Sequence, residues 1–510
     1  MTYRNPVVRG HAPDPSIVRV GAYYYLANSS FGMLPGIPIR RSRDLVDWTV
    51  IGHAVTRPSQ YRRDGADGPI ELFAPTLRWH DGVFHLVCTN AHPGQGNFLL
   101  TATDPAGPWS DAVWIDEVAF DPSLFRDDDG TWYYQRRSLD FGRRDGMLGP
   151  IVQAEIDVRT GALGELRPIT PTAGGFVTND IEGPHVFRRG DWYYLSGAEG
   201  SSWRGHAQSI ARSRSPWGPF EPAPHNPIVT HRHRVGHPIQ SLGHADFVEA
   251  EDGSWWAVAL GTRHAPLSQH HNIGRETFLL PVRWVDDWPV VGDEGTTELI
   301  VHDVEPPAGG IADAVRPEPV WLTVGAAHEG LDRAQAGRRL TVPPGGELHE
   351  TRRALGALLT PQTDDDQELR ATVCAEGAGV AVFVDRTHHY SALLAGSGAD
   401  RVVRFRRRAD DLETVLDAAL PGTGPVTLSI AARPDSYAFR ASDGDATVDI
   451  GSGSARLLSA EAVEWFRAVH FALVHVGAEG GDAAVFEEVT AADLEPLPPA
   501  LMPPFIRELL

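Results

Sequence analysis

The chain contains no lysine, because all 45 of its basic residues are arginine. A mechanism that forms a Schiff base on lysine is therefore excluded, and so is a phosphate-binding loop that depends on lysine. The 67 acidic residues give a formal net charge of −22. Nucleic acids and anionic membrane surfaces bind clustered positive charge, so we expect neither as a partner.

Cysteine is also scarce. Cys88 and Cys374 each lie in an apolar, strand-like stretch, which predicts buried inert thiols rather than a disulfide framework or a thiolate metal site. No apolar run approaches the ~20 residues that cross a membrane. The amino-terminal stretch MTYRNPVVRGHAPDPS lacks the apolar segment of a secretory signal. We therefore expect a soluble protein of the cytoplasm.

Short strand-like runs rich in aromatic and branched residues recur along the first 300 residues, each preceded by a turn such as HDG, DDDG or AEDGS. This order is typical of β-hairpins. Five hairpins align on Ile17, Leu77, Leu124, Val186 and Phe247, at intervals of 47 to 62 residues. The repeat predicts a five-bladed β-propeller with generous loops over residues 1–304. The alternative is a β-sandwich or barrel whose hairpins are similar by accident.

The sequence changes character after the repeat. Residues 305–319 are rich in proline, glycine and alanine and are typical of a linker. Alternating strands then follow, which predict a second all-β domain over residues 320–495, a β-sandwich of the concanavalin-like jelly-roll type. Residues 496–510 form a proline-rich tail. The fold class is therefore all-β.

Three carboxylates and one histidine occupy related places in the repeats. The position three residues before each aligned apolar residue is Asp14, Ala74, Asp121, Gly183 or His244, and Glu182 directly precedes Gly183. In a propeller, the start of each innermost strand lies at the mouth of the central channel. We therefore expect Asp14, Asp121, Glu182 and His244 to converge on one axis.

Converging carboxylates suit glycoside hydrolysis. One carboxylate must activate water or attack the anomeric carbon, and a second must protonate the leaving oxygen. A third can keep that acid protonated by charge repulsion. A single Asp-Pro-Ser is more often a turn, but two copies and Glu-Gly-Pro at related repeat positions favour an active site.

The motifs HAPDPS, PGIPIRRSRDLVDW, FAPTLRWHDG, FDPSLFRDDDG, EGPHVFRRGDWYYL, SLGHADFVE and NIGRETFLLPVRW resemble glycoside hydrolase family 43. The family contains β-xylosidases and α-L-arabinofuranosidases, and the resemblance covers nearly the whole chain, the second domain included. It implies an inverting enzyme with Asp14 as general base, Glu182 as general acid and Asp121 as the residue that tunes the pKa of the acid.

The resemblance also implies a set of substrate-binding residues. Arg275 matches an arginine that binds hydroxyls of the terminal sugar, and His206 matches a pocket histidine. His244 matches a channel histidine that carries a hydrated Ca²⁺ in some members, which allows a structural or activating ion in the propeller channel. We expect no cofactor to be required. His244, Phe31, Phe73 and Trp203 are further candidate substrate-binding residues. The sequence departs from the family pattern near Phe31, Phe73 and Trp203, which leaves the exact sugar open.

Taken together, the sequence predicts an exo-acting, inverting hydrolase that releases terminal β-D-xylose, α-L-arabinofuranose or both from oligosaccharides. Two alternatives stay open: an enzyme of the same fold that acts on another furanoside, such as a galactofuranoside, and a non-catalytic carbohydrate-binding propeller. Whether the protein forms a homo-oligomer is also left open by the sequence.

Overall fold

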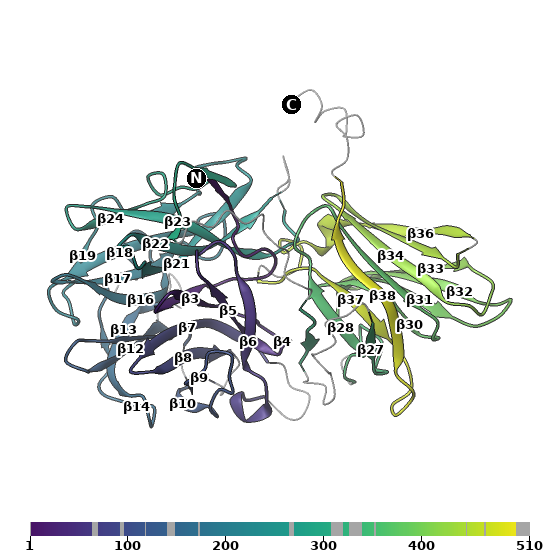
Figure 1. Ribbon diagram of the computed structural model, residues 1–510, viewed down its shortest axis with the longest axis horizontal. Coiled ribbons are helices and arrows are strands. Elements are labelled where there is room, and N and C mark those ends of the chain that lie inside the picture. Colours follow the sequence, from purple (N-terminus) through teal and green to yellow (C-terminus); the bar gives the residue numbers. More distant parts are fainter. Residues whose placement is uncertain are drawn as a thin grey trace. The chain divides into compact units, whose positions relative to one another are not determined.

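The computed structural model describes residues 2–63, 70–91, 96–117, 119–139, 148–171, 174–264, 270–307, 320–325, 339–350, 353–444, 446–463 and 466–495. It divides into two compact units, Met1–Glu318 with Leu322–His328, and Pro319–Trp321 with Glu329–Leu510 (Figure 1). Most of the predicted linker and the whole predicted tail lie outside the described residues.

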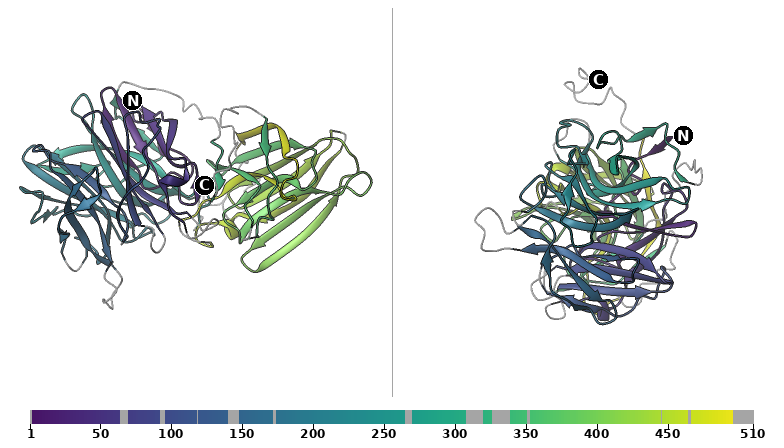
Figure 2. Two further views of the ribbon diagram at one scale, coloured as in Figure 1. Left: turned by 90° about the horizontal axis from the view of Figure 1, so that it is seen from below. Right: turned by 90° about the vertical axis from the view of Figure 1, so that its left-hand side faces the viewer.

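Five antiparallel sheets make up most of the described part of the first unit, and in each the strands follow one another in sequence order (Figures 1 and 2). Two of the sheets carry one additional short strand. The strands are β2 (Ser16–Val20), β3 (Tyr23–Ala27), β5 (Gly36–Ser42) and β6 (Thr49–Val55); β7 (Leu72–His80), β8 (Val83–Asn90), β9 (Gly96–Ala102) and β10 (Val113–Asp116); β11 (Ser123–Arg126), β12 (Trp132–Leu139), β13 (Leu148–Asp157), β14 (Ala162–Leu163) and β15 (Arg167–Pro168); β16 (Ile181–Arg189), β17 (Trp192–Glu199), β18 (Ala207–Ser213), β19 (Glu221–Pro222) and β20 (Val229–Thr230); and β21 (Ile239–Glu249), β22 (Trp255–Arg263), β23 (Arg275–Val285) and β24 (Trp288–Val291).

The five predicted hairpins are confirmed by the strand pairing. Each aligned apolar residue lies on the first strand of its sheet and faces a residue of the second strand: Ile17 faces Leu26, Leu77 faces Leu86, Leu124 faces Tyr134, Val186 faces Leu195 and Phe247 faces Ala257. All ten are buried. The apolar residues of the repeat are therefore the packing positions of the sheets, as alternation along a half-buried strand requires.

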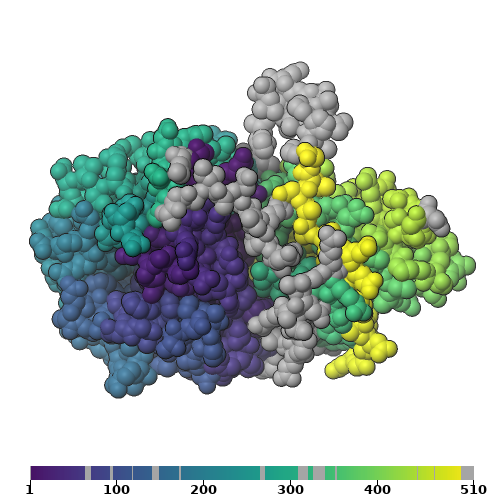
Figure 3. Space-filling view, in the orientation of Figure 1, coloured from purple at the N-terminus to yellow at the C-terminus, as the bar shows by residue number. Residues whose placement is uncertain are grey.

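The amino-terminal segment closes this unit against its last strands. β1 (Thr2–Arg4) pairs with β25 (Ile300–His302), and Val8 bridges to Thr277 on β23. Tyr3 and Val8 share an apolar cluster with Val258 of β22. Figure 3 shows purple residues of the amino-terminal part next to teal residues of the last sheet. This closure brings together residues that lie about 270 to 300 positions apart in the sequence.

A short additional sheet joins β4 (Met33–Leu34) to β26 (Thr323–Val324). The sequence assigned residues 320–495 to the second domain, but residues 322–328 group with the first unit. The backbone pairing with β4 is the physical reason for this difference, since main-chain hydrogen bonds hold the returning segment.

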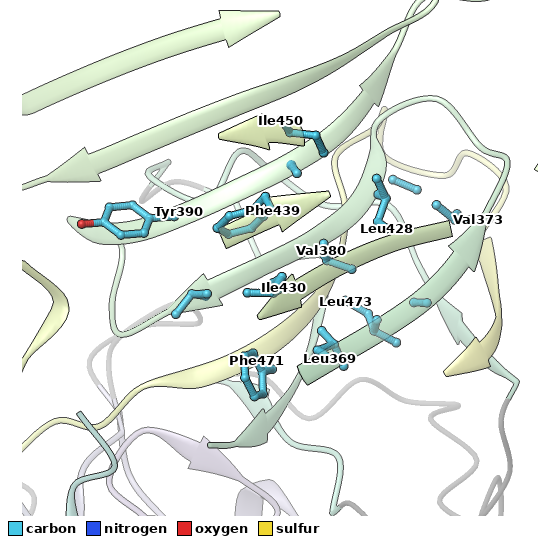
Figure 4. Packing of buried hydrophobic residues seen from close by; sticks show 14 of the residues in the cluster. Leu369, Val373, Val380, Tyr390, Leu428, Ile430, Phe439, Ile450, Phe471 and Leu473 are labelled. Carbon is cyan, nitrogen blue, oxygen red and sulfur yellow. The ribbon is translucent and has the colours of Figure 1, made fainter. Parts of the chain in front are cut away.

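The second unit contains two six-stranded antiparallel sheets. Side chains of both sheets meet in one apolar core, including Leu369, Ile430 and Phe439 from one sheet and Val380 and Phe471 from the other (Figure 4). A sandwich packs in this way because the inner residues of each strand alternate with outer ones. One sheet orders its strands β27 (Leu340–Val342), β38 (Ala484–Asp493), β29 (Gln367–Val373), β34 (Val426–Arg433), β35 (Ser436–Ser442) and β36 (Thr447–Ser454), and the other β28 (Ala357–Pro361), β37 (His470–His475), β30 (Ala378–Phe383), β31 (His388–Ala395), β32 (Val402–Ala409) and β33 (Leu412–Ala419).

Helical structure in the described residues consists of short 3-10 turns such as Pro58–Gln60 and Ala455–Leu458. None of the described helices is long and apolar enough to cross a membrane. Of the two cysteines, Cys88 is buried as expected, whereas Cys374 is exposed.

Candidate active site

The five related positions at the strand starts share an unusual backbone conformation. Asp14, Ala74, Asp121, Gly183 and His244 have φ angles of 52°, 41°, 57°, 53° and 47°. Residues other than glycine rarely adopt this left-handed region. In three of the sheets the pairing register also shifts here, as at a β-bulge. Bulges redirect side chains next to active sites. The repeat therefore produces five equivalent bends, and three of them carry Asp14, Asp121 and His244.

Asp14 is a buried carboxylate surrounded by donors. Arg275 Nη1 donates a hydrogen bond to Oδ1 at 3.0 Å, and Ser29 Oγ donates to Oδ2 at 2.5 Å. His244 Nδ1 lies 3.7 Å from Oδ1. Burial alone would raise the pKa of Asp14, but Arg275, His244 and Ser29 together lower it below its usual value. Asp14 is therefore ionised at neutral pH and can accept a proton.

Polar neighbours outside the predicted site hold Asp14 in place. Asn28 Nδ2 donates to the carbonyl oxygens of Ala12 and Pro13, and Ser29 Oγ also accepts a hydrogen bond from the backbone N–H of Ala74. Asn28 is fully buried. The Asn-Ser-Ser triplet directly after β3 is the sequence signal for these contacts, because polar residues after an apolar strand need buried partners.

Asp121 and Glu182 form a second charged group. The backbone N–H of Gly183 donates to Asp121 Oδ2 at 2.9 Å. Burial is the main cause that raises the pKa of Asp121 well above its usual value, and the charges of Glu182 and Asp14 act in the same direction. Arg137 opposes them. Two carboxylates in such a place retain a proton to higher pH than either would alone.

Arg137 is a site residue that sequence reasoning missed. It lies on β12, and its Nη1 donates a hydrogen bond to Glu182 Oε2 within an ion pair. Its backbone N–H donates to the carbonyl oxygen of Phe120, which directly precedes Asp121. The sequence offered only Arg-Arg at the end of a strand, and alternation alone could not tell which of the two points toward the site.

The predicted substrate-binding residues divide into two sets. Arg275 Cζ lies 5.4 Å from the centre of the Phe31 ring, and the rings of Phe31 and Phe73 are 4.8 Å apart. These three residues therefore gather beside Asp14. Trp203 lies in the loop between β17 and β18 with 52% of its surface exposed, and its carbonyl oxygen accepts the backbone N–H of His206.

The two predicted histidines are both buried. His206 Nδ1 lies 2.9 Å from the carbonyl oxygen of Ser241, and burial lowers the pKa of His206 to about 4, so the ring is neutral. The ring of His244, on β21, packs closely against Gly183 of β16, since a Cβ on Gly183 would lie 2.7 Å from His244 Cε1. Glycine at position 183 therefore provides both the left-handed turn and the room for the His244 ring.

The described residues around His244 do not form a cage of protein ligands for calcium, and the hydrated ion expected there stays a prediction. Calcium prefers six to eight oxygen ligands. Among the described residues, no group of three histidine, cysteine or carboxylate ligand atoms within 4.8 Å of one another includes His244. Asp14, whose Oδ1 lies 3.7 Å from His244 Nδ1, is already engaged by Arg275 and Ser29.

A buried polar network lies beneath these residues. Arg78 Nη1 donates to Asp246 Oδ2 at 2.9 Å, and Ser16 Oγ donates to the same oxygen at 2.8 Å. His185 Nδ1 lies 3.1 Å from Arg78 Nη2. These four side chains come from β2, β7, β16 and β21, the first strands of four sheets. The first strands are therefore joined by side-chain contacts just after the left-handed positions.

The chain also matches a known protein family. The family model of Glycosyl hydrolases family 43 matches residues 3–289. The chain belongs to glycosyl hydrolases family 43. It is thus a glycoside hydrolase, and the resemblance inferred from its motifs is confirmed.

Relatives of this family-43 chain match it over different lengths. The non-reducing end alpha-L-arabinofuranosidase BoGH43B of Bacteroides ovatus is 36% identical over 93% of this chain and 92% of its own length. A xylosidase/arabinosidase of Butyrivibrio fibrisolvens is 41% identical over 56% of each chain. The solved structure of Bacteroides ovatus xyloglucan PUL GH43B has a TM-score of 0.85 and 34% identity, and covers 97% of this chain and 100% of its own.

Proposed function

We propose that this family-43 hydrolase is an exo-acting, inverting enzyme that removes a terminal pentose, α-L-arabinofuranose or β-D-xylose, from oligosaccharides. The observation that carries the proposal is the contrast between the carboxylates. Asp14 is held ionised by Arg275 and His244, whereas the pKa of Asp121 beside Glu182 is raised by burial and by neighbouring negative charge. An ionised buried carboxylate near a pair of carboxylates that retains a proton supports one base and one acid, and the family resemblance assigns the acid of that pair to Glu182.

In this mechanism Asp14 accepts a proton from the attacking water while Glu182 donates one to the glycosidic oxygen. The anomeric carbon forms its new bond to water as the bond to the leaving alcohol breaks, so the configuration inverts. Asp121 is proposed to orient the acid, because its Oδ2 accepts the backbone N–H of Gly183, the residue that follows Glu182. Arg275, His206, Phe31, Phe73, Trp203 and His244 are proposed to bind the sugar.

The sugar is proposed from the named relatives and from the site. BoGH43B is named for arabinofuranoside hydrolysis at the non-reducing end, and the relative from Butyrivibrio fibrisolvens is named for both xylosidase and arabinosidase activity. The guanidinium of Arg275, beside the aromatic rings of Phe31 and Phe73, supplies donors for hydroxyls and an apolar wall for a small sugar ring.

We further propose that the five sheets β2–β6, β7–β10, β11–β15, β16–β20 and β21–β24 are the blades of a five-bladed propeller. The shared left-handed bends at the strand starts support this interpretation. The propeller then spans residues 1–304, and residues 305–319 link it to a sandwich domain that ends near residue 495, apart from the short return of β26.

No cofactor is proposed to be required, because the residues named above can supply the base, the acid and the sugar contacts. Treatment with a chelator should leave kcat/KM unchanged, and adding Ca²⁺ back should not increase it. A loss of activity that Ca²⁺ restores would instead assign an activating ion to the region of His244.

The test of the function is a panel of 4-nitrophenyl glycosides that includes α-L-arabinofuranoside, β-D-xylopyranoside and β-D-galactofuranoside. Nitrophenol should be released from one or both pentosides, and NMR should detect the inverted anomer first. Release from the galactofuranoside alone would identify another furanosidase. Release from none of them would contradict the proposed pentosidase activity and leave the natural substrate to be sought elsewhere.

A further inference from the structure

The general acid assigned above has a cationic partner. Arg137 Nη1 donates a hydrogen bond to Glu182 Oε2, and the side chains of Arg137 and Glu182 are 3% and 16% exposed. Opposite charges in a buried, hydrogen-bonded pair interact strongly because little water screens them. This ion pair is unexpected beside a residue that must carry a proton.

The surroundings of Arg137 fix its guanidinium. Its Cζ lies 4.9 Å from the centre of the Phe120 ring, and its backbone N–H donates to Phe120. A cation over an aromatic face gains additional attraction. Nε and Nη2 are buried and make no hydrogen bond to any residue in the described ranges. Among the described residues, the guanidinium of Arg137 therefore makes one hydrogen bond, and its partner is Glu182.

We infer that Arg137 is a positioning residue of the general acid: it engages Oε2 of Glu182, leaves Oε1 to face the leaving oxygen, and stabilises the carboxylate that remains after proton transfer. The inference rests on the proposed role of Glu182. When Glu182 donates its proton, the glycosidic C–O bond breaks, the proton stays on the departing alcohol, and one negative charge is left on Glu182 beside Arg137.

Arg137 and Asp121 therefore act in opposite directions on the same proton. Asp121 favours retention of a proton in the pair of carboxylates, and Arg137 favours its release to the substrate. Removing the cation should weaken the acid, so that hydrolysis slows most for leaving groups that need protonation. It should also let the acid stay protonated to higher pH.

The neighbouring arginine is a matched control. Arg136 lies on the same strand, and its Nε donates to Asp116 Oδ2 at 2.6 Å. The side chains of Arg136 and Asp116 are 8% and 15% exposed, close to the values for Arg137 and Glu182. Successive strand residues point to opposite faces, so Arg136 has a similar ion pair away from the three carboxylates.

The experiment compares Arg137→Met, Arg137→Lys, Arg136→Met and Glu182→Ala in the full chain. It measures kcat/KM across pH on a 4-nitrophenyl pentoside and on an unactivated disaccharide. Arg137→Met should lose about 100-fold on the disaccharide and far less on the aryl glycoside. Its basic limb should move up by about one pH unit or more. Arg137→Lys, which keeps the charge, should retain the wild-type limb.

Arg136→Met should lose equal activity on both substrates without a shift of either limb. The same result for Arg137→Met would overturn the inference, because a merely structural arginine affects both substrates alike. If Glu182→Ala itself has no leaving-group dependence, the assignment of the acid fails. If Glu182→Ala has that dependence and Arg137→Met has not, only the role of Arg137 fails.

Discussion

Replacing Arg275 tests how the site keeps its base ionised. Arg275 Nη1 and Asp14 Oδ1 are 3.0 Å apart, with side chains only 3% and 7% exposed. Burial is the largest influence on the pKa of Asp14 and raises it, so the net lowering depends on Arg275 first and on His244 and Ser29 next. In Arg275→Met, burial remains while the strongest opposing charge is lost.

The magnitude follows from the ion pair. An opposite charge at this distance lowers the pKa of a carboxyl group by about 1–3 units, which corresponds to about 1.4–4 kcal/mol between the two protonation states. The pKa of Asp14 should therefore rise, and the acid limb of kcat/KM should move up by about 1–3 pH units in Arg275→Met. The kcat/KM profile is the right measurement because it reports the free enzyme.

Arg275→Lys separates this effect from sugar binding. Lysine keeps the positive charge but lacks the planar fork of donors, so activity should fall while the acid limb stays near its wild-type position. Circular dichroism and thermal unfolding should verify that both variants are folded. If Arg275→Met loses activity at every pH and its acid limb does not move, Arg275 only binds the sugar and the reasoning about Asp14 is wrong.

Three further predictions concern the acid, stability and the domain boundary. The kcat/KM of Glu182→Ala should fall about 100-fold or more on a disaccharide but much less on a nitrophenyl glycoside, whereas that of Asp14→Ala should fall equally on both substrates. The opposite dependence would reverse the two roles. Denaturant unfolding should find lower stability at about pH 5 than at neutral pH, because burial lowers the pKa of His185 to about 3 and of His470 to about 4. These folded-state values lie below the unfolded value of 6.5, so the stability is present above about pH 6.5 and is lost as pH falls, by up to about 1.4 kcal/mol per pH unit for each ring; a pH-independent free energy of unfolding would contradict this. A chain that ends at residue 305 should be less soluble than one that ends at residue 328, because only the longer one keeps β26 paired with β4; equal solubility and activity would argue against a role for that pairing.

Much of the architecture was predictable because it is periodic. The spacing of Ile17, Leu77, Leu124, Val186 and Phe247 places an apolar side chain on the first strand of each sheet, and the same alignment finds all five left-handed positions. Alternation along strands acts over a few residues, so it can be read from the chain. The boundary of the first unit could not be read in this way, since the pairing of Thr323 with Leu34 depends on a return over nearly 300 residues.

The sequence by itself determined which carboxylates occupy the repeat positions, because Asp14 and Asp121 precede related strands and Glu182 precedes Gly183. Only the tertiary structure decided their chemical states. Arg275 reaches Asp14 across 261 positions, and Arg137 reaches Glu182 across 45. A pKa depends on burial and on charges a few ångströms away, and neither quantity is a property of the local sequence.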